Sequence, residues 1–578
     1  MPDSTFVNGS GSLLDRLWNL IRRRPWLSLA VLTALQTAFT LSSRALWFSD
    51  EVRYADAYAG LLRGRWLVLS LNGVAYPDKP PLYFWFLRAL DMLPGLSSGP
   101  ADPAVFFLGA AVSGLLVLYA TLLWARALGL PDETGALAGL LLLTTLFFSG
   151  LLHYSRMDLL FTALIIAAQA AFCVAFRPMN GPGEETRRSR FCTLALVLAG
   201  LATLTKGPLG LLFPLLTTGL FLAWRGRGRE FFRAQMLPGL AALLALVFSW
   251  IVAAYFVEGP EFLRKIFVEQ IFQRATKTFH HAEPWSFYLV AFPPCWLPWT
   301  LALFALPVRN VFSAAFWRGL LAGRKNASPQ ADARAWLWIS AVSGLVLLSL
   351  LSGKVVVYIL PQLAPLALLL ALALLGDGAP RPWQRLWTAA GLLFLALAAA
   401  TTQLERFLPA PLELSGTWAV AGGFAACGLG LLLLRRQNAR RVLPVLAVLT
   451  SLWVQPASQT LAPALDAIMS PKPQADALKA YAERGYLPVS HDIYQGIYSY
   501  YFGGVVRETA GFNILDQLVA QQDVVLAIKK KKWDTWDTRP RQMTIVLTQW
   551  LAGQPYYVAV SRRDGAAPEP LPRALPQP

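Results

Sequence analysis

Apolar runs long enough to cross a bilayer recur along this chain, and they limit its possible folds more than any other feature. A membrane-spanning helix needs about 20 apolar residues in succession. Only 15% of the residues are charged, against about 25% in soluble domains. The sequence therefore predicts an all-α polytopic membrane protein with about thirteen transmembrane helices. The runs lie near residues 26–47, 103–127, 135–152, 157–177, 191–205, 207–224, 236–257, 285–307, 335–351, 355–375, 384–402, 416–434 and 442–463.

Basic loops predict the orientation of these helices. If segment 81–98 is not a span, the Arg-rich N-terminus and every strongly basic loop lie on one side of the membrane. The positive-inside rule assigns that side to the cytoplasm. A spanning helix at 81–98 would turn the later loops outward, so we predict an interfacial or re-entrant segment there. The loops concerned are residues 178–190, 224–234, 308–334, 376–386 and 435–441.

The net charge of +18 has two compatible explanations. Cytoplasmic loop bias accounts for most of an excess of this kind, and attraction to an anionic lipid substrate would add to it. Neither explanation requires a nucleic-acid partner, and we predict none.

The C-terminal region, residues 464–578, is predicted to be periplasmic, since it follows about thirteen spans. It is more polar than the rest and contains a helical pattern, QADALKAYAERG, which Gly485 would end. The apolar segments DVVLAI and MTIVLTQW predict buried strands. We therefore expect a small α/β domain with a loose, proline-rich tail at 562–578. The basic run Lys529–Lys532 is typical of a solvated surface, with contact to lipid headgroups as the alternative.

Six polar clusters fall at the outer ends of the predicted helices. Simpler explanations exist for each: Asp50 could lie in a solvated helix end, and Asp158 could be a helix N-cap. Lys206 and Lys354 could be snorkelling side chains. Because the clusters share one membrane boundary, we interpret them together as a functional site. They are DEVRY at 50–54, YPDKPPLYFW at 76–85, HYSRMD at 153–158, TKG at 205–207, FHHAEPW at 279–285 and SGK at 352–354.

The residue types in these clusters suit group transfer at a lipid phosphate. Carboxylates can act as general bases or hold a divalent metal, and Arg and Lys bind phosphate oxygens. The nearby apolar helices can hold a lipid tail, so we predict transfer from a lipid phosphate at the outer leaflet. The sequence has no Walker motif and no dinucleotide-binding glycine fingerprint, so no nucleotide cofactor is expected. The alternative of a transporter or flippase would need polar residues deep within helices and repeat symmetry.

The order of the motifs resembles that of a known enzyme family. Acidic residues after the first span, a DKPP segment and an RxD motif are similar to GT-C glycosyltransferases, which use a lipid-phosphate sugar as donor. The resemblance is greatest to the 4-amino-4-deoxy-L-arabinose lipid A transferases of Gram-negative bacteria, which are related to protein O-mannosyltransferases. That family usually has Glu where this chain has Asp78. The motifs are DExRY (Asp50, Glu51, Arg53, Tyr54), YxxKP (Tyr76, Lys79, Pro80), TKG (Lys206), HxxPW (His281, Pro284, Trp285) and KxxxYILP (Lys354, Tyr358, Pro361).

The resemblance implies a GT-C transmembrane domain at residues 1–463, with juxtamembrane helices in a first periplasmic loop at 48–102, and a periplasmic domain at 464–578. It implies a bacterial inner-membrane enzyme with a cytoplasmic N-terminus. The family moves aminoarabinose from undecaprenyl phosphate onto lipid A phosphates, which confers resistance to polymyxin. Direct attack by the acceptor would invert the sugar. Alternatives within glycosyl transfer are another lipid-phosphate sugar and a protein or glycan acceptor.

The same resemblance implies roles for individual residues. Asp50 and Asp158 are the expected catalytic carboxylates, which orient the acceptor phosphate or polarise the sugar. Glu51 is expected to support them by holding Arg53 or the loop. A carboxylate and an imidazole suit Zn²⁺ or a similar ion, so Asp78 and His281 are the expected metal ligands. The expected substrate- and phosphate-binding residues are Arg53, Tyr54, Tyr76, Lys79, Arg156, Lys206, Lys354 and Tyr358.

Overall fold

The computed structural model describes residues 12–93, 102–178, 183–273, 283–305, 328–376, 381–408 and 414–564, together with a few isolated positions. Most of these residues are helical, as the apolar runs predict. Within them, eight helical segments are long and apolar enough to cross a membrane, and two apolar helices are shorter. The eight are Pro103–Ala127, Asp158–Phe176, Glu184–Lys206, Ala234–Glu258, Pro329–Leu350, Val356–Leu375, Trp383–Thr401 and Ala439–Met469; the shorter two are Leu209–Trp224 and Thr417–Leu433.

Three expected spans fold instead as short or interrupted helices, so the described residues do not form thirteen uninterrupted spans. The break within 135–152 follows Thr144, whose hydroxyl donates to the Leu140 carbonyl one turn back. The break within 285–307 follows Pro293 and Pro294, which lack the amide hydrogens that a helix needs. The resulting elements are α2 (Pro25–Thr37), η1 (Thr40–Ser42), α6 (Asp132–Leu143), α7 (Leu146–Leu151), α14 (Phe287–Cys295), η5 (Trp299–Leu301) and α15 (Ala302–Ala305).

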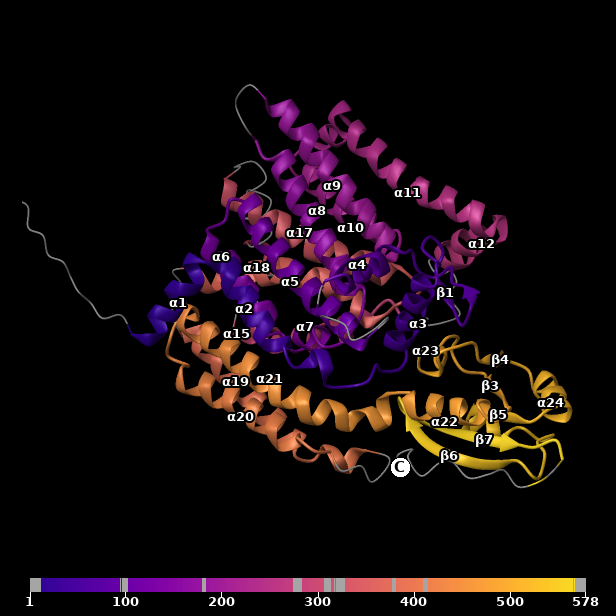
Figure 1. Ribbon diagram of the computed structural model, residues 1–578. Coiled ribbons are helices and arrows are strands. Elements are labelled where there is room, and N and C mark those ends of the chain that lie inside the picture. Colours follow the sequence, from indigo (N-terminus) through magenta and orange to yellow (C-terminus); the bar gives the residue numbers. More distant parts are fainter. Residues whose placement is uncertain are drawn as a thin grey trace, which may run out of the picture.

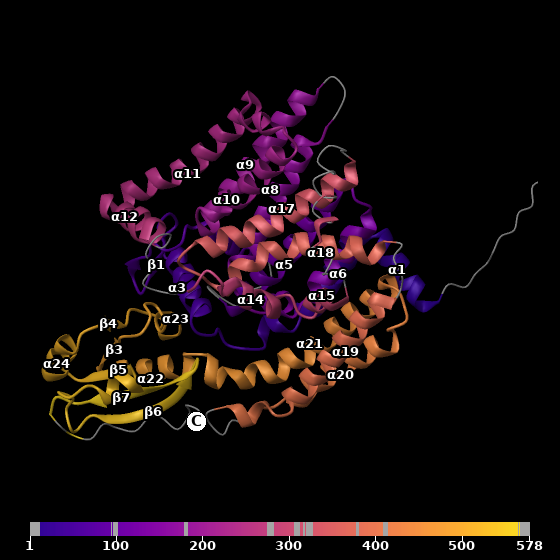
Figure 2. The same ribbon diagram turned by 180° about the vertical axis from the view of Figure 1, so that it is seen from behind.

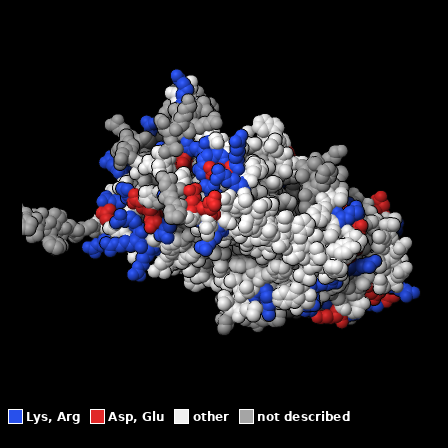
Figure 3. All heavy atoms as spheres, turned by 90° about the horizontal axis from the view of Figure 1, so that it is seen from above, with Lys and Arg blue, Asp and Glu red and all other residues white. Residues whose placement is uncertain are grey.

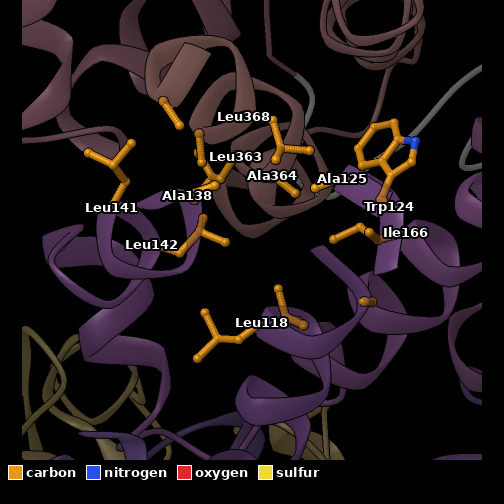
Figure 4. Close-up of a cluster of buried hydrophobic side chains, with 14 of the residues drawn as sticks. Leu118, Trp124, Ala125, Ala138, Leu141, Leu142, Ile166, Leu363, Ala364 and Leu368 are labelled. Carbon is orange, nitrogen blue, oxygen red and sulfur yellow. The ribbon is translucent and has the colours of Figure 1, made fainter. Parts of the chain in front are cut away.

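The helices pack around a core formed by α5 (Pro103–Ala127), α6, α8 (Asp158–Phe176) and α18 (Leu360–Leu375). Figure 4 shows side chains of these four helices meeting in this core, with Trp124 from α5, Ile166 from α8 and Leu368 from α18. Where α2 crosses α6, a Cβ atom at Gly139 would lie 2.6 Å from the Leu29 side chain. A larger residue at this position would therefore displace the Leu29 side chain, and small residues are common where membrane helices approach closely.

The other long helices surround this core on opposite sides (Figures 1 and 2). One side carries α9 (Glu184–Lys206), α10 (Leu209–Trp224), α11 (Leu237–Glu258) and α12 (Pro260–Arg264), and the other carries α19 (Arg381–Thr401), α20 (Thr417–Leu433) and α21 (Ala439–Met469). Further elements are α1 (Leu13–Arg23), α17 (Pro329–Leu350), η2 (Gly228–Phe232), η3 (Ala234–Met236), η4 (Lys265–Gln273), η7 (Val356–Ile359) and η8 (Leu404–Phe407).

The first long loop, between α2 and α5, is folded. It contains α3 (Asp50–Leu62), a hairpin of β1 (Ser70–Leu71) and β2 (Val74–Ala75), and α4 (Leu82–Asp91). With 10 residues, α4 is about 15 Å long, half the thickness of a bilayer core. This length agrees with the prediction that segment 81–98 does not span, although positions 94 and 96–98 lie outside the described residues.

Charged side chains gather at the two ends of the face that Figure 3 shows, with a broad and nearly uncharged belt between them. Such a belt is expected where a protein meets hydrocarbon. At one end, ion pairs join α1 and four of the loops that the sequence predicts to share one side of the membrane. These pairs are Asp15–Arg441 at 2.8 Å, Glu133–Arg440 at 2.9 Å, Arg188–Glu230 at 3.2 Å, and Arg225–Asp332.

Beyond α21 the chain forms a five-stranded mixed sheet with strand order β4–β3–β5–β7–β6. We call residues 470–564 the sheet region. β3 is parallel to β4 and β5, and β7 is antiparallel to β5 and β6. The segments DVVLAI and MTIVLTQW supply β5 and β6, as predicted. β5 is buried, as expected, but β6 is an edge strand whose residues 544–548 are exposed or half-buried, so the prediction of a buried strand is wrong for β6. The elements are α22 (Lys472–Ala482), β3 (Leu487–His491), α23 (Ser499–Phe502), β4 (Arg507–Thr509), α24 (Phe512–Gln521), β5 (Val524–Lys529), α25 (Lys530–Asp534), β6 (Thr544–Leu551) and β7 (Gln554–Ser561).

The sheet region is docked against the first loop through the buried side chain of Asn72, at the tip of the β1–β2 hairpin. Its amide nitrogen donates to the Val506 carbonyl at 2.6 Å. Its amide oxygen accepts from the Ser499 hydroxyl and the Val506 amide, both at 2.9 Å. A buried polar side chain with all these partners fixes the two segments in one register, because any shift would leave the amide unsatisfied.

Candidate active site

Four charged side chains form a continuous chain of ion pairs beside the first loop. Arg156 Nη1 lies 2.7 Å from Asp50 Oδ2, and Arg156 Nε lies 3.0 Å from Asp158 Oδ2. The other oxygen of Asp158 pairs with the ammonium group of Lys206. Three polar clusters that lie far apart in the sequence therefore meet: DEVRY, HYSRMD and TKG.

Helix ends position these charges. Asp50 is the first residue of α3 and Asp158 the first of α8, whereas Lys206 is the last residue of α9. Carboxylates are stabilised at helix N-termini and cations at C-termini, because each complements the helix dipole. Asp158 makes no capping hydrogen bond to the backbone of α8, so the simpler explanation of this residue as an N-cap is wrong. Its oxygens are used for Arg156 and Lys206 instead.

The two carboxylates differ in exposure. The side chain of Asp158 is 3% exposed and that of Lys206 7%, whereas Asp50 and Arg156 are 23% and 21% exposed. Asp158 is therefore enclosed between two cations, while Asp50 and Arg156 can meet a ligand. Burial alone would lower the pKa of Arg156, but Asp158 and Asp50 outweigh it and raise this pKa, so the guanidinium stays charged.

Aromatic rings complete the wall around these charges. The Lys206 ammonium lies 4.4 Å from the centre of the Tyr358 ring, a cation–π contact. Tyr54 is 2% exposed, and its ring meets those of Tyr83 and Phe84 at centroid distances of 6.0 and 5.8 Å. Burial, and then the Asp50 carboxylate, raise the pKa of Tyr54, so its hydroxyl keeps its proton. The Tyr54 hydroxyl is therefore a neutral, buried group close to these charges.

Arg53 provides a second guanidinium near Asp50. Its Cζ lies 5.4 Å from the centre of the Tyr76 ring, and its Nε donates to the Gln495 carbonyl at 3.1 Å. Burial alone would lower the pKa of Arg53, but Tyr76, Asp50 and Asp78 raise it above its usual value. Two residues of the YxxKP segment, Tyr76 and Asp78, therefore lie near Arg53. The last binding residue of the segment, Lys79, is half-buried in the turn between β2 and α4.

Glu51 binds Arg44 and not Arg53, contrary to one of the two roles expected for it. Its carboxylate accepts from both terminal nitrogens of Arg44, at 2.7 and 2.8 Å. It also accepts from the amides of Trp47 at 2.8 Å and Ser155 at 2.6 Å. Because Ser155 precedes Arg156, Glu51 ties the start of α3 to the segment that carries Arg156.

Sequence reasoning did not single out Arg44 or Gln495. Arg44 is a lone charge near the end of the apolar run 26–47, and such a charge commonly has a buried partner, so a signal existed. Gln495 acts through its backbone carbonyl, for which the sequence carries no signal.

Lys354 is directed to the backbone. Its ammonium donates to the carbonyls of Glu283, at 2.9 Å, and Leu351, so it ties the segment before α14 to the turn before η7. The structure therefore shows Lys354 holding two segments together, whereas Lys206 contacts a carboxylate of the ion-pair chain. Tyr358, four residues after Lys354, reaches this chain through Lys206.

Only one of the two expected metal ligands lies within the described residues. Asp78 lies near Arg53, and His281 lies outside the described residues. Within the part of the chain that the structure describes, no three His, Cys, Asp or Glu side chains are grouped as metal ligands would be. The two-residue metal site of Asp78 and His281 therefore stays a prediction.

Known proteins are similar to this chain in sequence. The family model of dolichyl-phosphate-mannose-protein mannosyltransferases matches residues 78–255. An undecaprenyl phosphate-alpha-4-amino-4-deoxy-L-arabinose arabinosyl transferase of Pseudomonas aeruginosa (strain UCBPP-PA14) is 31% identical over 421 residues, 71% of each chain. The chain belongs to this arabinosyl transferase family. A second member, from Pseudomonas paraeruginosa, is 30% identical over 415 residues, which cover 69% of this chain and 71% of that one.

The fold of the family is also the fold of this chain. The crystal structure of ArnT from Cupriavidus metallidurans bound to undecaprenyl phosphate superposes with a TM-score of 0.75 at 20% identity, covering 94% of this chain and all of that one. The archaeal oligosaccharyltransferase AglB from Archaeoglobus fulgidus has a TM-score of 0.52 at 14% identity, over 90% of this chain and 71% of its own. Both likenesses show a shared overall fold.

Proposed function

We propose that this protein transfers 4-amino-4-deoxy-L-arabinose from undecaprenyl phosphate to a phosphate of lipid A. Its family members carry this donor in their names, and the ArnT structure of the same fold is bound to undecaprenyl phosphate. The observation in this chain that carries the proposal is the ion-pair chain from Asp50 through Arg156 and Asp158 to Lys206. It supplies one guanidinium and one carboxylate that are partly exposed, and a buried ammonium next to them.

The proposed reaction is a single displacement at the sugar. An oxygen of the acceptor phosphate forms a bond to the anomeric carbon, the bond from that carbon to the donor oxygen breaks, and undecaprenyl phosphate leaves with the electron pair. The configuration at the anomeric carbon is therefore inverted. A phosphate with a pKa of about 6 is largely ionised at neutral pH, so positioning and charge balance matter more than a general base.

The geometry divides the residues between two tasks. Asp50 is the carboxylate that can touch a substrate. It is more exposed than Asp158, and it pairs with Arg156 alone, whereas Asp158 pairs with two cations. Asp158 orients the Arg156 guanidinium and the Lys206 ammonium through its two ion pairs. These two cations balance the negative charge of the leaving phosphate. The second phosphate contact is assigned to Arg53, which has Tyr54 and Tyr76 beside it, together with Lys79 of the YxxKP segment.

The proposed setting is the bacterial inner membrane, with thirteen crossings in residues 1–463 as the family resemblance implies, a cytoplasmic N-terminus and a periplasmic domain at 464–578. The ion-paired basic loops at one end of the bundle support a cytoplasmic assignment of that end under the positive-inside rule. The ion-pair chain with Asp50 then faces the periplasm. Modification of lipid A there would mask its negative charge and confer polymyxin resistance.

Lipid A mass spectrometry tests the proposal. The chain is expressed in a strain that lacks its own aminoarabinose transferase but makes the donor, and the protein amount is checked in the membrane. We expect an added aminopentose with the wild type, and none with Asp50→Asn. Asp132→Asn, in the exposed Arg126–Asp132 pair at the start of α6, removes the same charge beside the basic loops and should keep the addition. An added hexosamine would change the sugar, and unmodified lipid A with folded wild type would refute the proposal.

A further inference from the structure

The loop after β3 connects the candidate site to a basic surface on the sheet region. Gln495 in this loop accepts the hydrogen bond from Arg53. The ring of Tyr494, its neighbour, lies 6.0 Å from that of Phe48, two residues before Asp50. The Lys529 ammonium lies 5.9 Å from the centre of the same Tyr494 ring. Tyr494 therefore links Phe48, just before α3, to Lys529 at the end of β5.

This surface lies where ligands commonly bind in α/β sheets. β3, β4 and β5 are parallel, with His491 paired in register to Thr509 and to Ile528, so their carboxyl ends share one edge. Crevices outside the carboxyl ends of parallel strands are the usual binding places of such sheets. In this protein the edge is turned toward Phe48, since Phe48 also contacts Tyr556 at the start of β7.

Of the four lysines at 529–532, two pair with a carboxylate of the described residues and two do not. Lys530 pairs with Asp534 at 2.6 Å, and Lys532 pairs with Asp492 at 3.3 Å. For Lys529 and Lys531, no carboxylate within the described residues lies at ion-pair distance, and Lys531 is exposed. The carboxyl edge therefore presents a net positive charge next to the loop that holds Arg53.

We propose that Lys529 and Lys531 bind a phosphate of the lipid A headgroup other than the one that reacts. The inference rests on the proposed function, because it assigns the acceptor of that reaction to this edge. An acceptor with two phosphates must place one at the sugar donor and hold the other elsewhere. Lysine binds phosphate as a point charge and needs no fixed geometry, which suits a headgroup that enters from the membrane surface.

The test compares two double variants of the full-length protein in detergent. Lys529→Gln/Lys531→Gln removes the two proposed contacts, and Arg562→Gln/Arg563→Gln removes two charges just beyond β7, at the opposite end of the sheet. Binding of the soluble glucosamine disaccharide bisphosphate, without acyl chains, is measured by calorimetry. Transfer is measured with bisphosphorylated and monophosphorylated lipid A.

We expect the lysine variant to bind the disaccharide about tenfold more weakly and to have a similarly raised KM for bisphosphorylated lipid A, at unchanged kcat and donor KM. The arginine variant should match the wild type. Equal affinities in wild type and lysine variant would overturn the inference while leaving transfer intact. Equal losses in both variants, or an equal loss of binding to phosphatidylglycerol vesicles, would also overturn it, because the effect would be one of overall charge.

Failure of the proposed function has a different signature. If the wild type transfers no sugar to either lipid A but binds the disaccharide through Lys529 and Lys531, the acceptor surface stands and the reaction does not. If transfer to both forms of lipid A is equally fast in the lysine variant and the wild type, the proposed reaction is supported and the proposed phosphate binding by Lys529 and Lys531 is refuted.

Discussion

Glu51 and Arg44 form a bidentate ion pair, with oxygen–nitrogen distances of 2.7 and 2.8 Å, in which the two side chains are 0% and 2% exposed. The Arg44 guanidinium also lies 4.0 Å from the Trp47 ring and 4.4 Å from the Phe107 ring. The pair therefore sits between α3 and α5, next to the charges of the candidate site, and contributes to their placement.

Removal of Glu51 should destabilise the protein strongly. Glu51→Ala leaves the Arg44 charge buried without its partner and should cost about 3–5 kcal/mol. The measurement is the thermal unfolding midpoint in detergent. Glu258→Ala breaks the more exposed Arg65–Glu258 pair, also 2.7 Å long, and should cost about 1 kcal/mol or less. Similar midpoints for the two variants would show that the buried pair does not hold the loop.

A double-mutant cycle should show coupling between Asp158 and Lys206. Lys206→Met leaves the enclosed Asp158 with Arg156 alone, and Asp158→Asn leaves Lys206 without its carboxylate. We expect the double variant to lose less free energy of unfolding than the two single variants together, by about 0.5–3 kcal/mol, as for residues in direct contact. Sugar transfer should be absent from all three variants, since the cation is also proposed to balance the phosphate.

The control for this cycle lies at the opposite end of the bundle. Asp332→Asn breaks the Arg225–Asp332 ion pair and should lower the unfolding midpoint without abolishing transfer. Full transfer in Asp158→Asn/Lys206→Met would contradict the placement of the site.

Stability should fall between about pH 4 and pH 6 because of Asp56, on α3. Burial raises the pKa of its carboxyl to about 6. The folded state therefore holds a proton that the unfolded state has released in this range, so unfolding becomes easier as the pH rises. The loss amounts to at most about 3 kcal/mol for a shift of about two pH units.

Asp56→Asn should remove this dependence. Asparagine mimics the protonated carboxyl and can still accept the Asn72 amide, which bonds Asp56 Oδ2 at 2.6 Å in the wild type. The unfolding midpoints of variant and wild type should be similar at pH 4.5 and diverge toward pH 7.5, with the variant higher. Asp132→Asn, at an exposed carboxylate, is the control and should show a smaller change. A constant difference across the range would contradict the buried titration.

The proposed metal pair predicts metal content. Purified wild type should contain about one divalent ion per chain, and both Asp78→Asn and His281→Ala should lower that content several-fold, as expected when a ligand is lost. Inductively coupled plasma mass spectrometry measures this without reference to activity. His491→Ala is the control, since that imidazole bonds the Thr509 hydroxyl at 2.9 Å in the sheet region. Wild type free of metal, or three variants with equal content, would remove Asp78 and His281 as ligands.

Much of the membrane architecture could be predicted, whereas helix interruptions could not. Long segments such as α5 and α8 coincide with their apolar runs because hydropathy is a local property that the bilayer reads directly. The run 135–152 looks equally continuous, yet it divides after Thr144. The break depends on hydroxyl–carbonyl bonds and on neighbours such as Trp299, whose indole donates to the Leu141 carbonyl from 158 residues away.

By itself, the sequence determined that the chain is a polytopic membrane protein, and it predicted which loops share a side of the membrane and which motif residues form one site. These conclusions follow from apolar length, loop charge and motif order, all of which can be read along one dimension. Only the tertiary structure decided that Asp50 is the accessible carboxylate, that Glu51 binds Arg44, and that Arg53 meets Gln495, 442 residues away. Such contacts depend on which helix ends and loops pack together, and packing is set by the whole fold.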